Sequence, residues 1–338
     1  MRCCANCFGD EHLRLEVIPS LTDQTGNCSY CGSNNEFLVV PIRLRDYFEL
    51  LTNIYEACDE GVTLVEWLKK DWAMFRHPTM DVAHAKELLA EILDDGDVVR
   101  KRFKPPAPDV SDALERWEAL RGELMHSNRF FPQTEINLER LKRLFSFLLI
   151  KNSNIPKRWH RARIQQSGAL CRLDEMGAPP KNLASHGRAN PAGIPYLYLA
   201  STELTAISEV RPHTGEEISV AEFSIPEDLK IADLRHPRRT ISPFILPDEN
   251  EISLLRQDIE FLEKLGQELT RPVLPRSAAF DYIPSQYLCE YVKVCGFDGV
   301  MYRSSVGDGE NLALFSPSCA TGVDVRSIKV SRVSVEFP

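Results

Sequence analysis

Polar residues of types used in catalysis are concentrated in the stretch GRANPAGIPYLYLASTELTAISEV, residues 187–210. Arg188 and Asn190 belong to a turn rich in proline and glycine, Tyr198 to a short apolar strand, and Glu209 to the helix-like segment that follows. A guanidinium binds phosphate oxygens through two parallel hydrogen bonds. A glutamate on a partly buried helix flank is costly unless it is paired. We therefore expect Arg188 to pair with Glu209, either as a structural ion pair beside a core tyrosine or within a functional site.

Two further segments carry residues that can join this site. The segment WHRARI supplies Arg161 on a strand. The segment GVMYRSSVGDGENLALF places Ser304 at the end of one strand and Asn311 near the start of the next, after a loop that contains glycine. Ser305 takes the place of Ser304 if the loop is shifted by one residue. Three separate segments of the chain must therefore meet to form one site.

A second candidate site lies close to the N-terminus. Two pairs of cysteines, each pair enclosing two residues, are separated by twenty residues: Cys4 with Cys7, and Cys28 with Cys31. This spacing is close to that of a four-thiolate zinc site. Four thiolates close the tetrahedron of the ion and leave no position for water. The pattern predicts a structural Zn²⁺ ion in a zinc ribbon, with free thiols as the alternative, and Cys3 can replace the adjacent Cys4.

The composition indicates a globular protein of two or three domains. The 338 residues are 43% hydrophobic and 26% charged. No apolar run reaches the length of a membrane span, and the N-terminus lacks the apolar core of a signal peptide. We expect a cytoplasmic protein with no membrane partner. The net charge of −9 disfavours broad binding to nucleic acid.

The pattern of elements changes near residue 150. Residues 39–150 place apolar side chains at helical spacing, as in LRDYFELLTNIYEAC and in VAHAKELLAEILDD, which Thr79 or Asp81 can cap. Strand-like and helix-like segments then mix without regular alternation, which favours an α+β fold over a doubly wound sheet. We predict a zinc ribbon over residues 1–38, a helical domain over 39–150 and an α+β domain over 151–338.

Residues 155–325 resemble the RES domain, a family named for its arginine, glutamate and serine. Three motifs match in order: HRAR, GRANPAGIPYLYLAS…AISEV and DYIPSQYLCEYVKVCGFDGVMYRSS…GENLALF. The resemblance implies an ADP-ribosyltransferase-like fold. It assigns catalytic roles to Arg188, Tyr198, Glu209 and Ser304, and ligand binding to Arg161, Asn190 and Asn311. Ala189 stands where the family has an aromatic residue.

The resemblance also implies a substrate and a reaction, because RES domains include bacterial toxins that consume NAD. We expect cleavage of the bond between nicotinamide and ribose of NAD⁺, by hydrolysis or phosphorolysis, in a toxin–antitoxin or antiphage role. An arginine binds the phosphates, and Glu209 stabilises the positive charge that develops on the ribose. Tyr198 stacks on the nicotinamide or ribose, and Ser304 orients the amide or a phosphate. The expected partners are an antitoxin or another regulatory protein, and a second copy of the chain. The first alternative to NAD⁺ degradation is the transfer of ADP-ribose to a protein or nucleic acid.

The helical region supplies a second alternative. It resembles the segment ahead of some RES domains that is related to HEPN proteins, whose ribonucleases carry an arginine followed after four to six residues by a histidine. RGELMH, from Arg121 to His126, meets this spacing, with Gly122 where a polar residue is typical. Ribonuclease activity, or nucleic-acid binding by the zinc ribbon, is thus the alternative to a regulatory or dimerising role. Residues 235–275 are an addition relative to the compact toxins of the family. We expect this segment to be one of four things: a lid, an interface, a regulatory element or a solvated helix.

Overall fold

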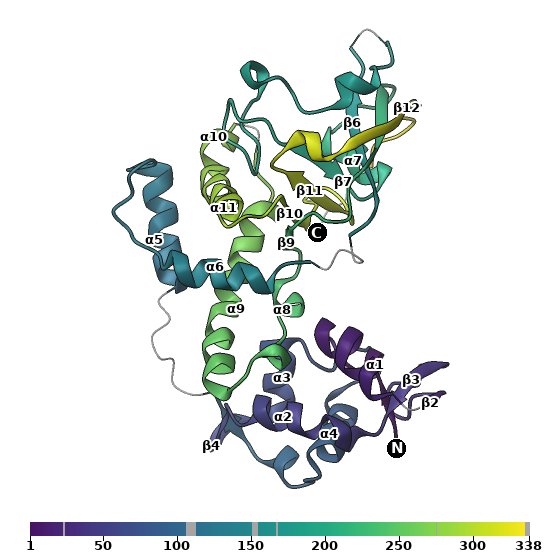
Figure 1. Ribbon diagram of the computed structural model, residues 1–338, viewed down its shortest axis with the longest axis vertical. Coiled ribbons are helices and arrows are strands. Elements are labelled where there is room, and N and C mark those ends of the chain that lie inside the picture. The colour runs from purple at the N-terminus through teal and green to yellow at the C-terminus, as the bar shows by residue number, and fades with distance from the viewer. Residues whose placement is uncertain (23, 106–112, 151–154, 167, 275, 335–338) are drawn as a thin grey trace. The chain divides into compact units, whose positions relative to one another are not determined.

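The computed structural model describes residues 1–22, 24–105, 113–150, 155–166, 168–274 and 276–334 (Figure 1). The chain forms two compact units. The first comprises residues 1–114 and 236–263, and the second comprises residues 115–235 and 264–338. The segment 236–263 therefore belongs to the first unit although it interrupts the sequence of the second. The three-domain division expected from the sequence remains a prediction about independent folding.

Short strands and helices make up the first unit. The strands are β1 Cys3–Cys4, β2 Gln24–Gly26, β3 Glu36–Val39, β4 Glu56–Val62 and β5 Phe103–Lys104. They pair as a three-stranded sheet, in the order β1-β3-β2, and a two-stranded sheet, β4-β5. The helices are α1 Ile18–Leu21, α2 Arg45–Thr52, α3 Leu64–Trp72, α4 Val82–Leu93 and α8 Pro237–Thr240, with α9 Glu249–Thr270 beginning in this unit and ending in the second.

Local signals explain some of these boundaries and tertiary pairing explains others. Helix α4 begins after Asp81, whose side chain accepts a hydrogen bond from His84 N at 2.9 Å, so the predicted N-cap is confirmed. The helix predicted over LRDYFELLTNIYEAC is too long, because α2 ends at Thr52 and β4 pairs with β5 far along the chain. The first 38 residues also contain helical turns, a π-helix at Leu13–Val17 and α1, that their lack of periodicity did not predict.

The second unit is built on one sheet. Its strands are β6 Arg158–Ile164, β7 Leu197–Ala200, β8 Glu217–Ser224, β9 Ile231–Asp233, β10 Gly299–Arg303, β11 Glu310–Leu314 and β12 Thr321–Lys329. Among the described residues they form seven strands in the order β12-β8-β6-β7-β11-β10-β9. All neighbours are antiparallel except β9 and β10, which are parallel. The helices are α5 Ala113–His126, α6 Leu138–Phe147, α7 Glu203–Glu209, α10 Ala278–Asp281 and α11 Ile283–Val294. The predicted α+β class is thus confirmed.

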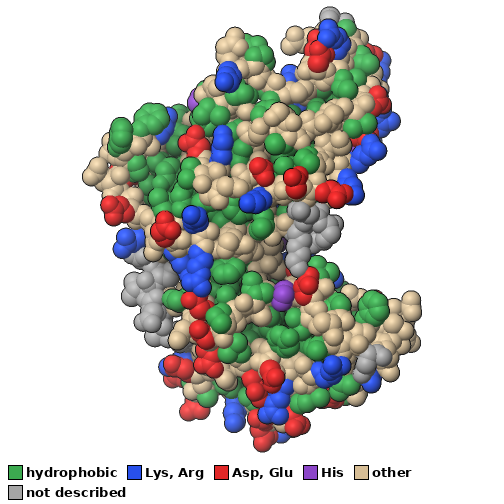
Figure 2. Space-filling view, viewed as in Figure 1, with side chains coloured by type: hydrophobic (Ala, Val, Ile, Leu, Met, Phe, Trp, Pro, Cys, Tyr) green, Lys and Arg blue, Asp and Glu red, His purple; other side chains and the backbone are tan. Residues whose placement is uncertain are grey.

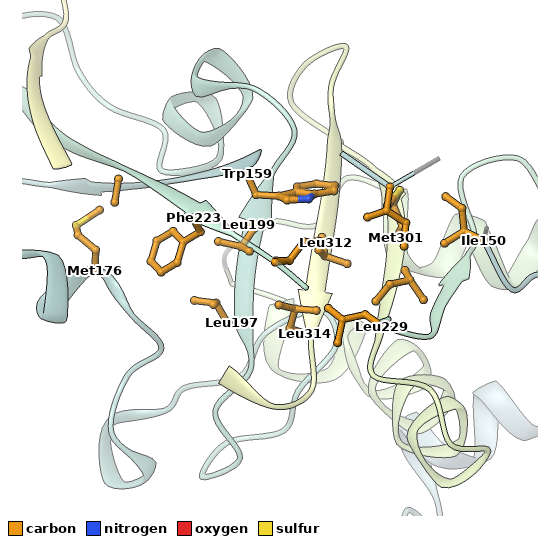
Figure 3. Close-up of a cluster of buried hydrophobic side chains, with 14 residues drawn as sticks. Ile150, Trp159, Met176, Leu197, Leu199, Phe223, Leu229, Met301, Leu312 and Leu314 are labelled. Atoms are coloured by element: carbon orange, nitrogen blue, oxygen red, sulfur yellow. The ribbon is translucent and has the colours of Figure 1, made fainter. Parts of the chain in front are cut away.

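Alternation along the strands separates the core of this unit from its candidate site. Leu197 and Leu199 of β7 lie in a buried cluster with Trp159 and Leu312 (Figure 3). Because successive side chains of a strand point to opposite faces, Tyr198 lies on the other face of the sheet. Helix α7 packs on β6, β7 and β8, and α11 packs on β10.

The surface features agree with the composition. Acidic and basic side chains are interspersed over the face shown in Figure 2. Within the described ranges, no helix is both long enough and apolar enough to cross a membrane.

Candidate active site

A cavity of about 300 Å³ in the second unit is lined by most of the residues that the sequence analysis assigned to the site. This volume is at the lower end of the range for small-molecule sites. The predicted residues that line it are Arg161, Arg188, Tyr198, Glu209 and Asn311. Strands β6 and β7 diverge beside the cavity. In the described chain only His160 and Ala200 are paired between them, whereas every residue of β6 is paired with a residue of β8. The cavity thus exposes side chains of β6 and β7.

Glu209, the last residue of α7, is held by two neutral donors. Its Oε1 atom accepts hydrogen bonds from Ser304 Oγ at 2.8 Å and from Asn311 Nδ2 at 2.6 Å. Ser304 follows β10 and Asn311 lies in β11, so the antiparallel pair β10–β11 delivers both donors to the carboxylate. These bonds fix the position of Glu209 without neutralising its charge. Ser304 is therefore a positioning partner of Glu209.

Arg188 does not pair with Glu209, so the ion pair expected from the sequence is wrong. Its Nη1 atom donates to the carbonyl oxygen of Arg271 at 2.7 Å, and its Nη2 atom donates to Ser305 Oγ at 2.9 Å. The guanidinium carbon lies 5.3 Å from the centre of the Tyr282 ring. The reason is topological, because the loop after β10 brings Ser304 to the carboxylate and Ser305 to the guanidinium. Both serines that the sequence offered as alternatives are therefore used.

The turn that carries Arg188 is held by Tyr198 and Asn190. The Tyr198 hydroxyl donates to Asn190 Oδ1 at 2.7 Å and accepts from Ala189 N at 2.9 Å. Asn190 Nδ2 donates to the carbonyls of Ser185 and Pro191, which leaves this side chain, buried at 3% exposure, engaged within the turn. The structure therefore places Asn190 behind the cavity and leaves only the ring of Tyr198 to face a ligand.

Sequence reasoning missed two residues of α11 that fasten the same turn. Ser285 Oγ donates to the Arg188 carbonyl at 2.5 Å, and Gln286 Nε2 donates to the Gly187 carbonyl at 2.8 Å. Both residues lie in DYIPSQYLCEYV, part of a motif that matched the family, but the motif match assigned no role to either of them. His160, Tyr282 and Tyr302 also line the cavity.

Arg161 lies in the cavity with part of its hydrogen-bonding capacity unused. Its Nη1 atom donates to the Tyr198 carbonyl at 2.9 Å, and its buried Nε has no hydrogen-bond partner in the described chain. Burial, and then the nearby Arg163 charge, lower the pKa of Arg161 to about 10. Arg161 therefore remains a cation at neutral pH.

The cavity contains two cations and one anion that do not pair with each other. In the part of the chain that is described, neither Arg161 nor Arg188 has a carboxylate within ion-pair distance, although Arg188 is buried and Arg161 is half-buried with its Nε atom removed from solvent. Burial raises the pKa values of Tyr198 and Tyr302, so both phenols stay neutral. Buried cations are costly unless they are paired, so the site is suited to a ligand that brings its own negative charge.

The cysteine pairs converge in the first unit. The sulfurs of Cys4, Cys7, Cys28 and Cys31 all lie within 4.8 Å of one another and all four residues are buried. The sulfurs of Cys4 and Cys31 lie 3.5 Å apart, and those of Cys7 and Cys28 lie 3.4 Å apart. A tetrahedral zinc ion with Zn–S bonds of ~2.3 Å separates its sulfurs by about 3.8 Å, so this donor set fits a structural Zn²⁺.

Cys3 is excluded from this donor set by its place in β1. Its thiol points to the Val39 carbonyl at 3.7 Å, because adjacent residues of a strand face opposite ways. Hydrogen bonds from the sulfurs of Cys4 and Cys7 lower the pKa of Cys28. The alternative of Cys3 for Cys4 is thereby resolved in favour of Cys4.

The residues of the RGELMH segment lie apart from the cavity. Arg121 Nε is 2.9 Å from Glu268 Oε1, and Glu268 is 2% exposed. His126, the last residue of α5, lines a separate hollow with the exposed Phe130 and Phe131. The arginine of this segment is thus engaged in an ion pair inside the second unit.

Comparisons with known proteins cover the same part of the chain. The sequence model of the RES domain matches residues 158–334, more than half of the chain. Among solved structures, a chain of the M. tuberculosis MbcT–MbcA toxin–antitoxin complex is similar, with 14% identity and a TM-score of 0.34, over 56% of this chain and 91% of that chain. At that TM-score the likeness carries no conclusion about fold or activity. No curated protein matches the sequence.

Proposed function

Since this chain belongs to the RES domain family, we propose that it binds NAD⁺ and cleaves the bond between nicotinamide and ribose. One observation carries the proposal. Two guanidiniums that have no carboxylate partner among the described residues, the half-buried Arg161 and the buried Arg188, line the same cavity as the fixed carboxylate of Glu209. NAD⁺ has the complementary charges: an anionic pyrophosphate and a ribosyl carbon that becomes positive as the bond to nicotinamide breaks.

Each side chain has a distinct task in the proposed reaction. Arg161 and Arg188 bind phosphate oxygens, for which a planar guanidinium is better suited than an ammonium. The ring of Tyr198 packs against the nicotinamide or ribose. The electron pair of the C–N bond moves to the pyridinium nitrogen, so nicotinamide leaves as a neutral ring and needs no proton. Glu209, held by Ser304 and Asn311, stabilises the cationic ribosyl group that remains.

A nucleophile then completes the reaction at the ribosyl carbon. Water adds with loss of a proton and gives ADP-ribose, whereas inorganic phosphate gives ADP-ribose phosphorylated at the same carbon. We propose water or phosphate as the acceptor. The activity depletes NAD⁺ in the producing cell, and we propose that a partner protein restrains it, as an antitoxin does.

The test is to follow NAD⁺ with the purified full-length chain and with Glu209→Ala, with and without phosphate. We expect loss of NAD⁺ and release of nicotinamide with the wild type only, and the phosphate dependence identifies the acceptor. Full activity of a folded Glu209→Ala variant would refute the assignment. Transfer of label from NAD⁺ to a protein or nucleic acid would replace it with ADP-ribosyl transfer.

A further inference from the structure

We propose that an ion-pair network of Arg121 and Arg271 around the buried Glu268 positions Arg188 for binding the anionic part of its ligand. The inference rests on the proposed function. The proposal gives a role to two parts of the chain that had none: the end of α9, within the segment that is additional to the compact toxins, and Arg121 of RGELMH. None of the three network residues lines the cavity, so each acts through Arg188.

Glu268 is the centre of the network. Its Oε1 atom lies 2.9 Å from Arg121 Nε, and its Oε2 atom lies 3.2 Å from Arg271 Nε. The side chain of Glu268 is 2% exposed, whereas those of the two arginines are 24% and 29% exposed. These contacts are ion pairs by distance only, because Arg121 Nε, Arg271 Nε and Glu268 Oε2 make no hydrogen bond within the described residues. A carboxylate removed from water to this extent requires compensation, and the charges of the two guanidiniums supply it. Glu268 thereby ties α5 to the end of α9.

Arg271 connects this network to the cavity through its backbone. It follows the last residue of α9, and its carbonyl oxygen accepts the hydrogen bond from Arg188 Nη1 at 2.7 Å. The Arg271 N–H donates to the Gln267 carbonyl at 2.8 Å, and its Nη2 atom donates to the Asp281 carbonyl at 2.6 Å. With Glu268 on its side chain as well, Arg271 is held from three directions, and its carbonyl is a fixed acceptor.

A helix-terminal carbonyl is well suited to this position. The last carbonyls of a helix lack partners within the helix and carry the negative end of its dipole, so they attract a cation without neutralising it. A carboxylate in the same place would form an ion pair with Arg188 and compete with the ligand. The Arg271 carbonyl and Ser305 Oγ instead orient the guanidinium and leave its charge available.

The experiment measures NAD⁺ binding by calorimetry in a Glu209→Gln background, in which slow turnover leaves most of the NAD⁺ intact during the titration. Glu268→Gln keeps the shape of the side chain but removes its charge, and Arg121→Gln removes the partner in α5. We expect each to weaken binding about tenfold, because Arg188 loses the preorganised acceptor that orients its guanidinium. Glu263→Gln is the matched control: it lies on the same helix and forms an ion pair with Arg238 at 2.8 Å in the first unit.

A double-mutant cycle separates positioning from a general loss of structure. If Glu268 acts through Arg188, Glu268→Gln has no further effect on affinity once Arg188→Ala is present. Equal effects in both backgrounds, or unchanged affinity in folded Glu268→Gln and Arg121→Gln variants, would overturn the inference while the proposed function stands. If Glu268→Gln fails to fold, Arg121→Gln alone decides, through the same cycle. Absence of NAD⁺ binding and of NAD⁺ consumption by the wild type would instead remove the proposed function, and the inference with it.

Discussion

Replacing Gly187 with alanine tests the packing that places Arg188 in the cavity. A Cβ atom at residue 187 would lie 2.3 Å from Asn190 Oδ1 and 2.4 Å from the Tyr198 hydroxyl. Ordinary contact begins near 3.4 Å, so these atoms must separate by about 1 Å. The hydroxyl cannot move alone, because it is bonded to both Asn190 and Ala189 N. The turn itself must shift, and Arg188 shifts with it.

The magnitude follows from the contacts that the methyl group disturbs. Overpacking of this kind costs about 1–3 kcal/mol, from which the restriction of the unfolded chain by alanine returns about 0.4–1 kcal/mol. We therefore expect a net loss of about 1–2 kcal/mol in the free energy of unfolding. The effect on activity is larger, because a displacement of about 1 Å costs on the order of a hundredfold in rate. The value of kcat/KM for NAD⁺ should fall by about this factor.

The assay pairs denaturant unfolding with NAD⁺ turnover over a range of substrate concentrations. Gly307→Ala is the matched control, since it lies in the loop that also carries Ser304 and a Cβ there meets nothing within 4 Å. That variant should retain wild-type KM and stability. The reasoning is refuted if folded Gly187→Ala keeps kcat/KM within about twofold of wild type, or if Gly307→Ala loses as much.

Three further predictions concern other parts of the chain. Glu209→Gln should lower kcat about 10²- to 10³-fold with unchanged unfolding, because it keeps the shape but removes the charge that stabilises the ribosyl cation; kcat above a tenth of wild type would contradict this. Asp10 is 1% exposed, and burial raises the pKa of its carboxyl from 3.8 to about 7, so its contribution to the free energy of unfolding is full below pH ~4 and is lost as the pH rises to ~7. The stability of Asp10→Asn relative to wild type should therefore increase by up to about 4 kcal/mol between pH ~4 and ~8. Denaturant unfolding over this pH range measures the difference, and a difference that does not change with pH would contradict the prediction. Cys4→Ala should lose bound zinc in metal analysis whereas Cys3→Ala keeps about one equivalent, and equal losses would disprove the four-cysteine set.

Signals that act over a few residues carried much of the prediction. The alternation in YLYLA identifies β7, and Asp81 marks the start of α4, because strand faces and helix caps depend on neighbouring residues only. The spacing of the cysteine pairs predicted a cluster that the structure forms. The ordered motifs of the RES domain identified the family, which the match over residues 158–334 confirms.

Partners far apart in the sequence were decided by the tertiary structure. Glu209 was expected to meet Arg188, twenty-one positions away, but its donors are Ser304 and Asn311, about a hundred residues distant. The hairpin β10–β11 brings the two donors together, and the pairing of β11 with β7, more than a hundred residues earlier, brings them to the carboxylate; no local pattern encodes that second pairing. The same holds for Arg121, whose partner Glu268 lies on a helix that the sequence left without an assigned task.

The sequence by itself determined which chemical groups this protein possesses, and in which local elements they occur, because residue type and short-range periodicity are written along the chain. Only the tertiary structure decided which groups face each other. Within the described ranges, two cations are left without carboxylates and one carboxylate is held by neutral donors because strands and loops remote in sequence close around one cavity. The burial of that cavity, rather than the list of its residues, makes its charges available to a ligand.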